Sequence, residues 1–220
     1  MTLTVIAHAN IEGHHFHAMK SSAEKHGYHL KIFNGKWHGL RSKITTLYTA
    51  SKTEDCDLLM LVDAFDTIFM AGPGKVMDLY EKHEGKALFS AEKACWPPHP
   101  VVNGRYIHTV DTPWRYLNSG GFIGPRKLFT DLLDKAWDEW NNKYDHGLGD
   151  QYFYHCLYLD NQNTIALDTG CEIFQSMAHH SLDGWIKGPD FIENPETGTM
   201  PVVLHFNGMT PMDGYLHYAE

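Results

Sequence analysis

The chain has 220 residues, of which 43% are hydrophobic and 20% charged, and its formal net charge is −9. This length and composition predict one globular domain over residues 1–220 and exclude a disordered or low-complexity protein. The acidic balance excludes nucleic acid as a partner, because no basic stripe is present to neutralise phosphates. No apolar run is long enough to span a membrane, and no segment has the pattern of a signal peptide. We therefore expect a soluble protein of the cytoplasm, or of the host-cell cytoplasm for a viral source.

Strand and helix patterns alternate in the first part of the chain. The predicted strands are residues 3–9, 28–33, 57–62 and 87–91, and the predicted helices are residues 14–26, 43–53 and 75–83. Gly27 is placed to end the first helix, and the three histidines within residues 14–17 are expected on its solvated face. Residues 34–42 form a glycine-rich loop that contains Trp37. Such alternation is typical of a mainly parallel sheet that is covered on both faces.

The regular alternation stops at residue 92. Residues 92–117 show no clear periodicity, and three of the ten prolines lie within residues 96–100. A long irregular segment in a compact domain is usually functional, and the aromatic residues of this one argue against disorder. Order resumes at residues 119–124, and the remaining predicted elements are helices at 126–140 and 150–158 and strands at 164–167, 171–174 and 201–206.

These elements predict an α/β fold with a single mixed, mainly parallel, Rossmann-like sheet flanked by helices. The chain lacks both the GxGxxG fingerprint and the P-loop pattern, which disfavours a nicotinamide oxidoreductase and a P-loop phosphotransferase. The four cysteines are widely spaced. This spacing does not match a zinc site, so we predict buried, reduced thiols.

Two carboxylates, Asp63 and Asp66, follow the apolar run at residues 58–62. The carboxyl end of such a strand is where an open α/β sheet binds its ligand. Burying two like charges is costly unless a counter-charge is present. A divalent cation that holds a substrate diphosphate would supply it. The alternative is a pair of surface carboxylates in a turn.

A third candidate ligand, His205, ends the apolar run at residues 202–204. Two carboxylates and one imidazole suit Mn²⁺ or Mg²⁺, with coordination positions left for phosphate oxygens. Zinc is disfavoured, because no thiolate lies nearby in the sequence. The alternative is a hydrogen-bonded core histidine.

Four small residues, Asn118, Ser119, Gly120 and Gly121, form another candidate site. Adjacent glycines let a ligand approach the backbone closely, and the asparagine and serine offer donors for sugar hydroxyls. The alternative is an ordinary turn that leads into a strand.

Three further residues are candidates for contact with an acceptor. Asp150 stands at a predicted helix start, either as an N-cap or as a carboxylate that orients or deprotonates an acceptor hydroxyl. Glu92 ends a predicted strand at the same side of the sheet. Trp96, just beyond it, either stacks on a pyranose ring or packs beneath the proline-rich loop.

Eight motifs in this chain resemble the glycosyltransferase domain of the multifunctional procollagen lysyl hydroxylases, a domain related to the procollagen galactosyltransferases. They occur in the family's order between residues 3 and 212. The motifs are LVDAFD (61–66), FSAE (89–92), CWP (95–97), LNSGGFIG (117–124), DQYFY (150–154), LYLD (157–160), IFQ (173–175) and HFNG (205–208).

The resemblance implies a GT-A fold, a Mn²⁺ site and a UDP-sugar donor. The family's metal ligands match Asp63, Asp66 and His205 of this chain. The loop that contains Trp37, together with Lys43, resembles the segment that holds the uridine and the phosphates.

Positions that handle the sugar and the acceptor in this family match Glu92, Asn118 and Asp150, which we expect to be catalytic, and Trp96. Substrate contacts are further expected from Asp63, Ser119, Gly120, Gly121, Gln151, Asn207 and Gly208. If the reaction inverts the anomeric centre, Asp150 is the expected base. If it retains the configuration, the leaving phosphate takes the proton and Asp150 positions the acceptor.

Family members transfer glucose from UDP-glucose to galactosyl-hydroxylysine, and some transfer a hexose directly to hydroxylysine. We therefore predict a hexosyltransferase that uses UDP-glucose or UDP-galactose and acts on a collagen-like protein or on a glycan. The alternatives are a transferase for a non-collagen glycan, a metal-dependent nucleotide-sugar hydrolase and a non-catalytic glycan-binding module.

The chain departs from the family pattern in several respects. It shows no oxygenase domain and no secretion signal, so we expect a stand-alone enzyme of viral or microbial origin. Gly-Met-Thr-Pro at residues 208–211 replaces the family's Asn-Gly-Pro-Thr ending. The acidic run before Asp150 is reduced at residues 144–149, a segment that we expect to face the acceptor.

Overall fold

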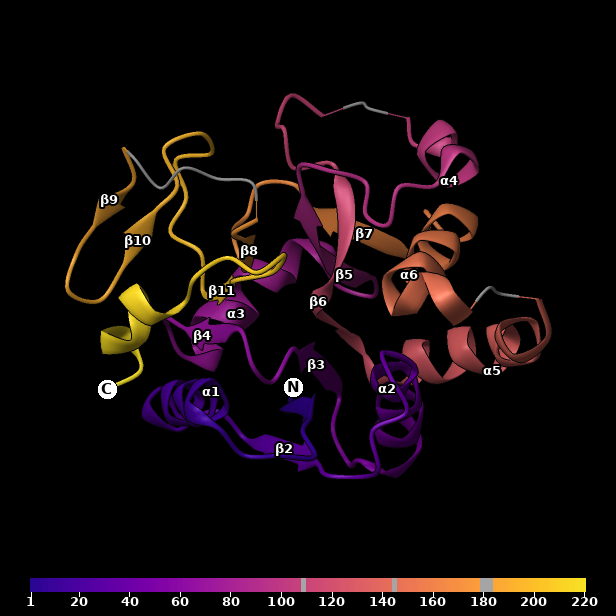
Figure 1. Cartoon of the computed structure of the whole chain (residues 1–220), viewed down its shortest axis with the longest axis horizontal. Coiled ribbons are helices and arrows are strands. Elements are labelled where there is room, and N and C mark those ends of the chain that lie inside the picture. Colours follow the sequence, from indigo (N-terminus) through magenta and orange to yellow (C-terminus); the bar gives the residue numbers. More distant parts are fainter. Residues whose placement is uncertain (108–109, 144–145, 179–183) are drawn as a thin grey trace.

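A computed structural model describes residues 1–107, 110–143, 146–178 and 184–220 (Figure 1). Its centre is a six-stranded sheet in the order β2-β1-β3-β6-β5-β7. Five strands run parallel, and β6 runs antiparallel to its neighbours β3 and β5. The strands are β1 Leu3–His8, β2 Leu30–Phe33, β3 Leu58–Val62, β5 Ala87–Glu92, β6 Tyr116–Pro125 and β7 Ile165–Asp168. The predicted mixed, mainly parallel sheet is confirmed.

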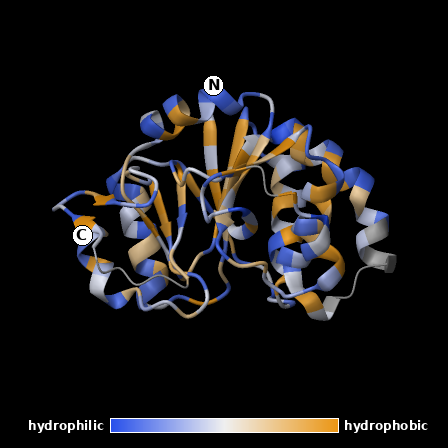
Figure 2. Ribbon diagram, turned by 90° about the horizontal axis from the view of Figure 1, so that it is seen from above, coloured by the Kyte–Doolittle hydropathy of each residue, from blue (hydrophilic) through white to orange (hydrophobic). Residues whose placement is uncertain are grey.

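Helices cover both faces of this sheet. They are α1 His14–Lys25, α2 Arg41–Thr53, α3 Pro73–Tyr80, α5 Arg126–Lys143 and α6 Gly149–Asp160. In β3, Leu58, Met60 and Val62 pack in one core with α1 and α3. Leu59 and Leu61 point the other way and pack with α2, α5 and α6. Figure 2 shows the hydrophobic strands between the two groups of helices. A strand buried on both faces explains the unbroken apolar run of β3.

A small second sheet brings the C-terminal part of the chain back beside β3. It contains β4 Thr67–Phe69, β11 Val203–His205 and β8 Phe174–Ser176, with β11 in the middle. β11 pairs antiparallel with β4, and His205 lies opposite Thr67. The backbone N–H of Phe206 then donates to the carbonyl oxygen of Asp66 at 2.7 Å. This pairing delivers the end of β11 to the turn that follows β3.

The remaining described elements are short. They are α4 Pro100–Arg105, β9 Ile186–Lys187, β10 Ile192–Glu193 and the 3₁₀ turns η1 Glu81–His83, η2 His146–Leu148 and η3 Asp213–Tyr218. The segment 92–117 is therefore not irregular throughout, since it holds α4 and the start of β6. Among the described helices, none combines the length and the apolar character that a membrane crossing requires.

Several local expectations are confirmed and one is wrong. Gly27 ends α1 with a φ of +78°, and the side chains of His14 and His17 are exposed. The strand expected at 171–174 begins only at Phe174. The cause is the buried carboxylate of Asp168, which accepts the backbone N–H groups of Glu172, Ile173 and Phe174 at 2.8–3.0 Å. These N–H groups therefore cannot form β-sheet hydrogen bonds, and the strand starts later than predicted.

The cysteines follow the sequence expectation only in part. All four are free thiols. Cys156 and Cys171 are buried as expected, whereas Cys56 and Cys95 are half-buried.

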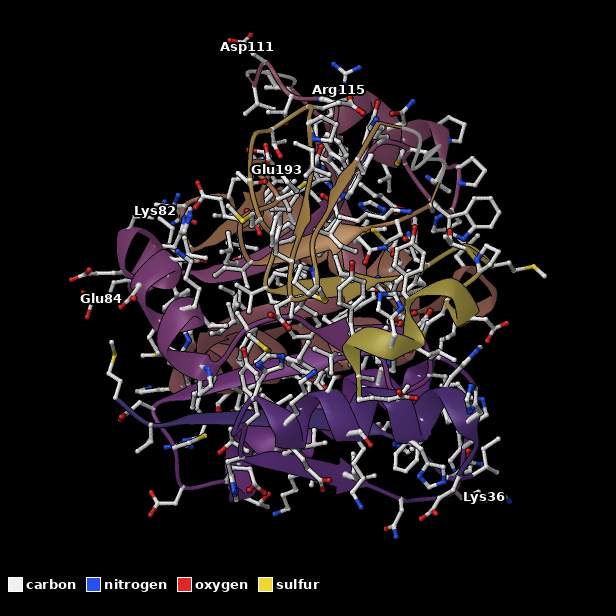
Figure 3. The ribbon with its side chains drawn as sticks, turned by 90° about the vertical axis from the view of Figure 1, so that its left-hand side faces the viewer. Lys36, Lys82, Glu84, Asp111, Arg115 and Glu193 are labelled. Atoms are coloured by element: carbon white, nitrogen blue, oxygen red, sulfur yellow. The ribbon has the colours of Figure 1, made fainter. Side chains whose placement is uncertain are left out.

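Charged side chains such as Lys36, Lys82 and Glu84 lie at the periphery of the molecule (Figure 3).

Replacing Asp168 with alanine should destabilise the fold. The change leaves three backbone N–H groups without their acceptor, and each unsatisfied buried donor costs about 1–3 kcal/mol. We expect the free energy of unfolding, measured by urea denaturation, to fall by about 3 kcal/mol or more. Asp160→Ala is the control, because this exposed carboxylate pairs with Arg105 at the surface and should change stability by less than about 1 kcal/mol. Equal losses in the two variants would contradict this role of Asp168.

Candidate functional site

Three side chains converge where the two sheets meet. Asp63 and Asp66 lie in the turn between β3 and β4, and His205 ends β11. One ligand atom from each residue lies within 4.8 Å of the others. The Nε2 atom of His205 is 3.4 Å from Oδ2 of Asp63 and 3.3 Å from Oδ2 of Asp66. The turn and the pairing of β11 with β4 therefore assemble a set of two carboxylates and one imidazole.

The buried amide of Asn118 sets the orientation of the His205 ring. Its Oδ1 atom accepts the backbone N–H of Gly120 at 3.0 Å, which identifies that atom as the oxygen. The same oxygen lies 2.9 Å from Nδ1 of His205, so Nδ1 carries a proton and donates it. The other nitrogen, Nε2, is thereby directed at the two carboxylates. An acceptor of this kind on the remote nitrogen is the usual support for a metal-ligating histidine.

The electrostatics of this triad fit a divalent cation. Burial alone would lower the pKa of His205, but the carboxylates of Asp66 and Asp63 raise it to about 10. The Nε2 atom is buried and faces the two carboxylate oxygens at 3.3 and 3.4 Å, but among the described residues it makes no hydrogen bond of good geometry. A donor set of two carboxylates and one imidazole suits Mn²⁺ or Mg²⁺ and would satisfy this atom.

A buried lysine links the triad to α6. The Nζ atom of Lys43, on α2, lies 2.7 Å from Oδ1 of Asp63 and 3.0 Å from Oδ2 of Asp150. Burial alone would lower the pKa of Lys43, but Asp150 and Asp63 raise it, so the ammonium stays charged. The pKa of Asp150 is raised by burial, against the opposing effect of Lys43. Asp150 lies in the first turn of α6 rather than at its N-cap, which is Leu148, and its carboxylate faces Lys43.

A second polar cluster centres on Gln151. Its Nε2 donates to Oε1 of Glu92 and, at 2.6 Å, to the carbonyl oxygen of Trp96. Its Oε1 accepts the N–H and the hydroxyl of Ser119 at 3.1 and 3.2 Å. The other oxygen of Glu92 accepts from Asn207 at 3.0 Å. Burial raises the pKa of Glu92 to about 7. Both oxygens of this carboxyl group are thus held in place by amide donors.

The glycine pair lies inside β6 at an irregularity rather than in a turn before it. Pairing of β5 with β6 skips residues 119–121, as in a β-bulge. A Cβ atom on Gly120 would lie 1.9 Å from the His205 ring, and one on Gly121 would lie 2.7 Å from Phe174. The positions that a Cβ atom would take are therefore filled by other side chains of the chain, which accounts for glycine at both residues.

Two adjoining cavities open over these groups. Their volumes are about 520 and 510 Å³, and they share Leu40, Lys43, Asp63 and Asp66. Trp37 lines the second cavity, and Gly121 lines neither of the two. The first cavity brings together the other predicted site residues, Lys43, Asp63, Asp66, Glu92, Trp96, Asn118, Ser119, Gly120, Asp150, Gln151, His205, Asn207 and Gly208.

Sequence reasoning missed several residues of these walls. The Trp96 side chain is 63% exposed, so its packing beneath the proline-rich loop, one of the two alternatives, is wrong. Residues 144–145 of the segment expected to face the acceptor lie outside the described residues. Sequence reasoning missed Ala178 and Met209 in the first cavity and His8, Asn10 and Phe65 in the second, whereas Leu40 and Leu148 belong to segments that it expected near the substrates. Single residues in loops carry no periodic signal that would have identified them.

Comparison with known proteins identifies relatives of this chain. A family model described as the PLOD GT domain matches residues 1–218. The uncharacterized protein R699 of Acanthamoeba polyphaga mimivirus is 32% identical over 196 residues, which cover 82% of this chain and 41% of that protein. The multifunctional procollagen lysine hydroxylase and glycosyltransferase LH3 of Pongo abelii is 34% identical over 163 residues, covering 70% of this chain and 21% of that protein. The chain thus spans less than half the length of these two curated relatives.

A solved structure shares the fold. It is described as a glycosyltransferase involved in the glycosylation of the major capsid of PBCV-1, with a TM-score of 0.55 and 11% identity over 96% of both chains. At this identity the likeness concerns the fold alone. The expected GT-A type arrangement is confirmed by this likeness and by the mixed, mainly parallel sheet with helices on both faces. Since the family model covers nearly the whole chain, this protein belongs to the PLOD GT domain family.

Proposed function

We propose that this chain is a metal-dependent hexosyltransferase that moves glucose or galactose from a UDP-sugar to an acceptor hydroxyl. The observation that carries the proposal is the convergence of Asp63, Asp66 and His205 on one point, with Nε2 of His205 directed at the carboxylates by Asn118. These three residues would hold Mn²⁺, with Mg²⁺ as the alternative. When bound there, the ion would offset the charge of the diphosphate and stabilise UDP as the leaving group.

The two cavities suggest how the donor would lie. Lys43 and Asp63 form part of the wall that they share, so the diphosphate would lie at this wall. The uridine would then occupy the cavity lined by Trp37 and His8, and the hexose would occupy the cavity lined by Glu92 and Asp150. Lys43 would add a cationic contact to the phosphates, since its ammonium stays charged despite burial.

The acceptor hydroxyl would enter the first cavity near Asp150. If the reaction inverts the anomeric centre, Asp150 would take the hydroxyl proton, and its pairing with Lys43 favours the ionised form that this requires. If the reaction retains the configuration, a phosphate oxygen of the donor would take the proton and Asp150 would position the acceptor. Glu92, held by Gln151 and Asn207, would contact the sugar.

For the acceptor we propose hydroxylysine or galactosyl-hydroxylysine in a collagen-like protein. The relatives support this choice, because one of them is named as a procollagen lysine hydroxylase and glycosyltransferase. A glycan that is not part of collagen is the alternative acceptor.

A panel of UDP-sugars with Mn²⁺ tests the donor and the metal together. A ligand at a hundred times its dissociation constant adds about 2.7 kcal/mol, which raises the melting temperature by about 5–10 °C for a chain of this size. We expect this rise for at least one UDP-hexose with Mn²⁺, and its loss in His205→Ala. His14→Ala, an exposed histidine on α1, is the matched control and should behave like the wild type. A rise that persists in His205→Ala would contradict the metal assignment. Rapid UDP-sugar breakdown without any acceptor would instead indicate a hydrolase.

Gly120→Ala should weaken metal binding without unfolding the protein. A methyl group at this position would overlap the His205 ring and displace Nε2 from the carboxylates. We expect Mn²⁺ affinity, measured by calorimetry, to fall about tenfold or more, as is typical when the support of a ligand is lost. Gly74→Ala on α3 is the matched control, because nothing lies within 4 Å of the added methyl. Unchanged Mn²⁺ affinity in a folded Gly120→Ala variant would refute the placement of His205 as a ligand.

Metal affinity should rise with pH. The raised pKa of His205, about 10, means that the metal-free ring is protonated at neutral pH. Binding through Nε2 must displace that proton, so the affinity for Mn²⁺ should increase by up to about tenfold per pH unit between pH 6 and 8. Titration calorimetry in two buffers of different ionisation enthalpy should detect about one proton released per ion. A pH-independent affinity with no proton release would exclude His205 from the site.

A further inference from the structure

The carbonyl oxygen of Trp96 is held by two side chains of α6. It accepts from Nε2 of Gln151 at 2.6 Å and from Nε2 of His155 at 2.8 Å. Positions 151 and 155 are one helical turn apart, so both side chains project from the same face of α6. The backbone of Trp96 is thus anchored by one buried and one half-buried donor, while the residue is 63% exposed at the wall of the first cavity.

The hydrogen bonds around His155 allow only one arrangement of protons in its neutral form. A carbonyl oxygen can only accept, so Nε2 of His155 donates to Trp96. The neutral ring then accepts at Nδ1, and the hydroxyl of Tyr106 donates to it at 2.5 Å. The Tyr106 oxygen in turn accepts the backbone N–H of Leu117 at 3.2 Å. We name this chain of bonds from Leu117 through Tyr106 and His155 to Trp96 the His155 relay.

The surroundings keep the His155 relay in this state. His155 is fully buried, and burial lowers its pKa to about 4, so the ring stays neutral at physiological pH. The relay joins three parts of the site. Leu117 directly precedes Asn118 on β6, and α6 also carries Asp150. A buried network with every member satisfied rigidifies the groups that it connects.

The position of Trp96 points to the acceptor rather than to the nucleotide. Its ring lines the first cavity with Glu92 and Gln151, whereas Trp37 lines the second. Lys43, Asp63 and Asp66 line both cavities. An exposed indole on a fixed backbone offers a flat apolar surface on which a substrate ring or chain can pack.

We propose that His155 and Tyr106 are positioning residues that fix the Trp96 ring as the contact surface for the acceptor. This inference rests on the proposed transferase function for the identity of the ligand. Trp96 belongs to the CWP motif, whereas the two positioning residues lie outside all eight motifs and do not line the first cavity.

Two variants and two controls separate positioning from simple packing. Tyr106→Phe keeps the ring and removes only the hydroxyl, and His155→Phe removes both polar atoms. His155→Gln is the conservative variant, because its amide can still donate to the Trp96 carbonyl. Tyr158→Phe is the matched control. The ring centroids of Tyr158 and Tyr106 are 5.7 Å apart in the same hydrophobic cluster, but Tyr158 is not a member of the His155 relay.

The first experiment follows the Trp96 ring directly. The protein is labelled with 5-fluorotryptophan, and Trp96→Phe assigns one of the six tryptophan signals in the ¹⁹F NMR spectrum. We expect the Trp96 signal to broaden or shift in Tyr106→Phe and His155→Phe, to recover in His155→Gln and to stay unchanged in Tyr158→Phe. An identical Trp96 signal in all four variants would overturn the proposal. This result does not depend on which reaction the enzyme catalyses.

The second experiment uses the UDP-sugar and acceptor that support turnover. In Tyr106→Phe and His155→Phe, the KM for the acceptor should rise about tenfold, the effect of losing one or two buried hydrogen bonds. The KM for the UDP-sugar and the stabilisation by Mn²⁺ with UDP should stay within about twofold of the wild type. Equal changes for donor and acceptor would overturn the acceptor assignment. If no UDP-sugar is turned over, the proposed function fails, and the ¹⁹F spectra still decide whether the relay positions Trp96.

Discussion

The candidate site depends on the negative charge of two neighbouring carboxylates after the end of β3. Asp63 and Asp66 follow the carboxyl end of β3, and their side chains are 20% and 35% exposed. Two groups of the chain offset this negative charge, namely the buried ammonium of Lys43 and the ring of His205. A divalent cation bound here would also offset the negative charge of the two carboxylates. The return of the chain through β11 places the third candidate ligand, His205, beside the first two.

Rigid supports surround this centre. Asn118 orients the histidine, and the missing side chain of Gly120 leaves room for its ring. Gln151 connects the neighbouring strand to the carboxyl group of Glu92 and to the Trp96 loop. Asn118 and Gly120 are buried and Gln151 is half-buried, so the candidate site residues are held by the sheet and by α6. Such preorganisation is what a transferase needs in order to hold donor and acceptor in register.

The sequence was sufficient to predict the parts of the site that follow a local pattern. An apolar run that ends in carboxylates identified Asp63 and Asp66, and a second such run identified His205. The packing of Gly120 against the histidine ring was not predictable, because it depends on a contact between residues 85 positions apart in the sequence. The strand at 171–174 was predicted wrongly for a different reason, since the carboxylate of Asp168, four to six residues earlier in the chain, binds backbone N–H groups and decides where β8 begins. A side chain that bonds to nearby backbone leaves no periodic trace in the sequence.

The most direct test of the metal centre is a crystal structure of the protein grown with MnCl₂ and UDP, with anomalous diffraction data collected at the manganese edge. The account predicts one strong anomalous peak within about 2.0–2.4 Å of carboxylate oxygens of Asp63 and Asp66 and of Nε2 of His205. Phosphate oxygens of UDP should complete the coordination. A peak elsewhere, or a His205 ring that bonds to Asn118 through its other nitrogen and leaves the carboxylates without an ion, would contradict the account.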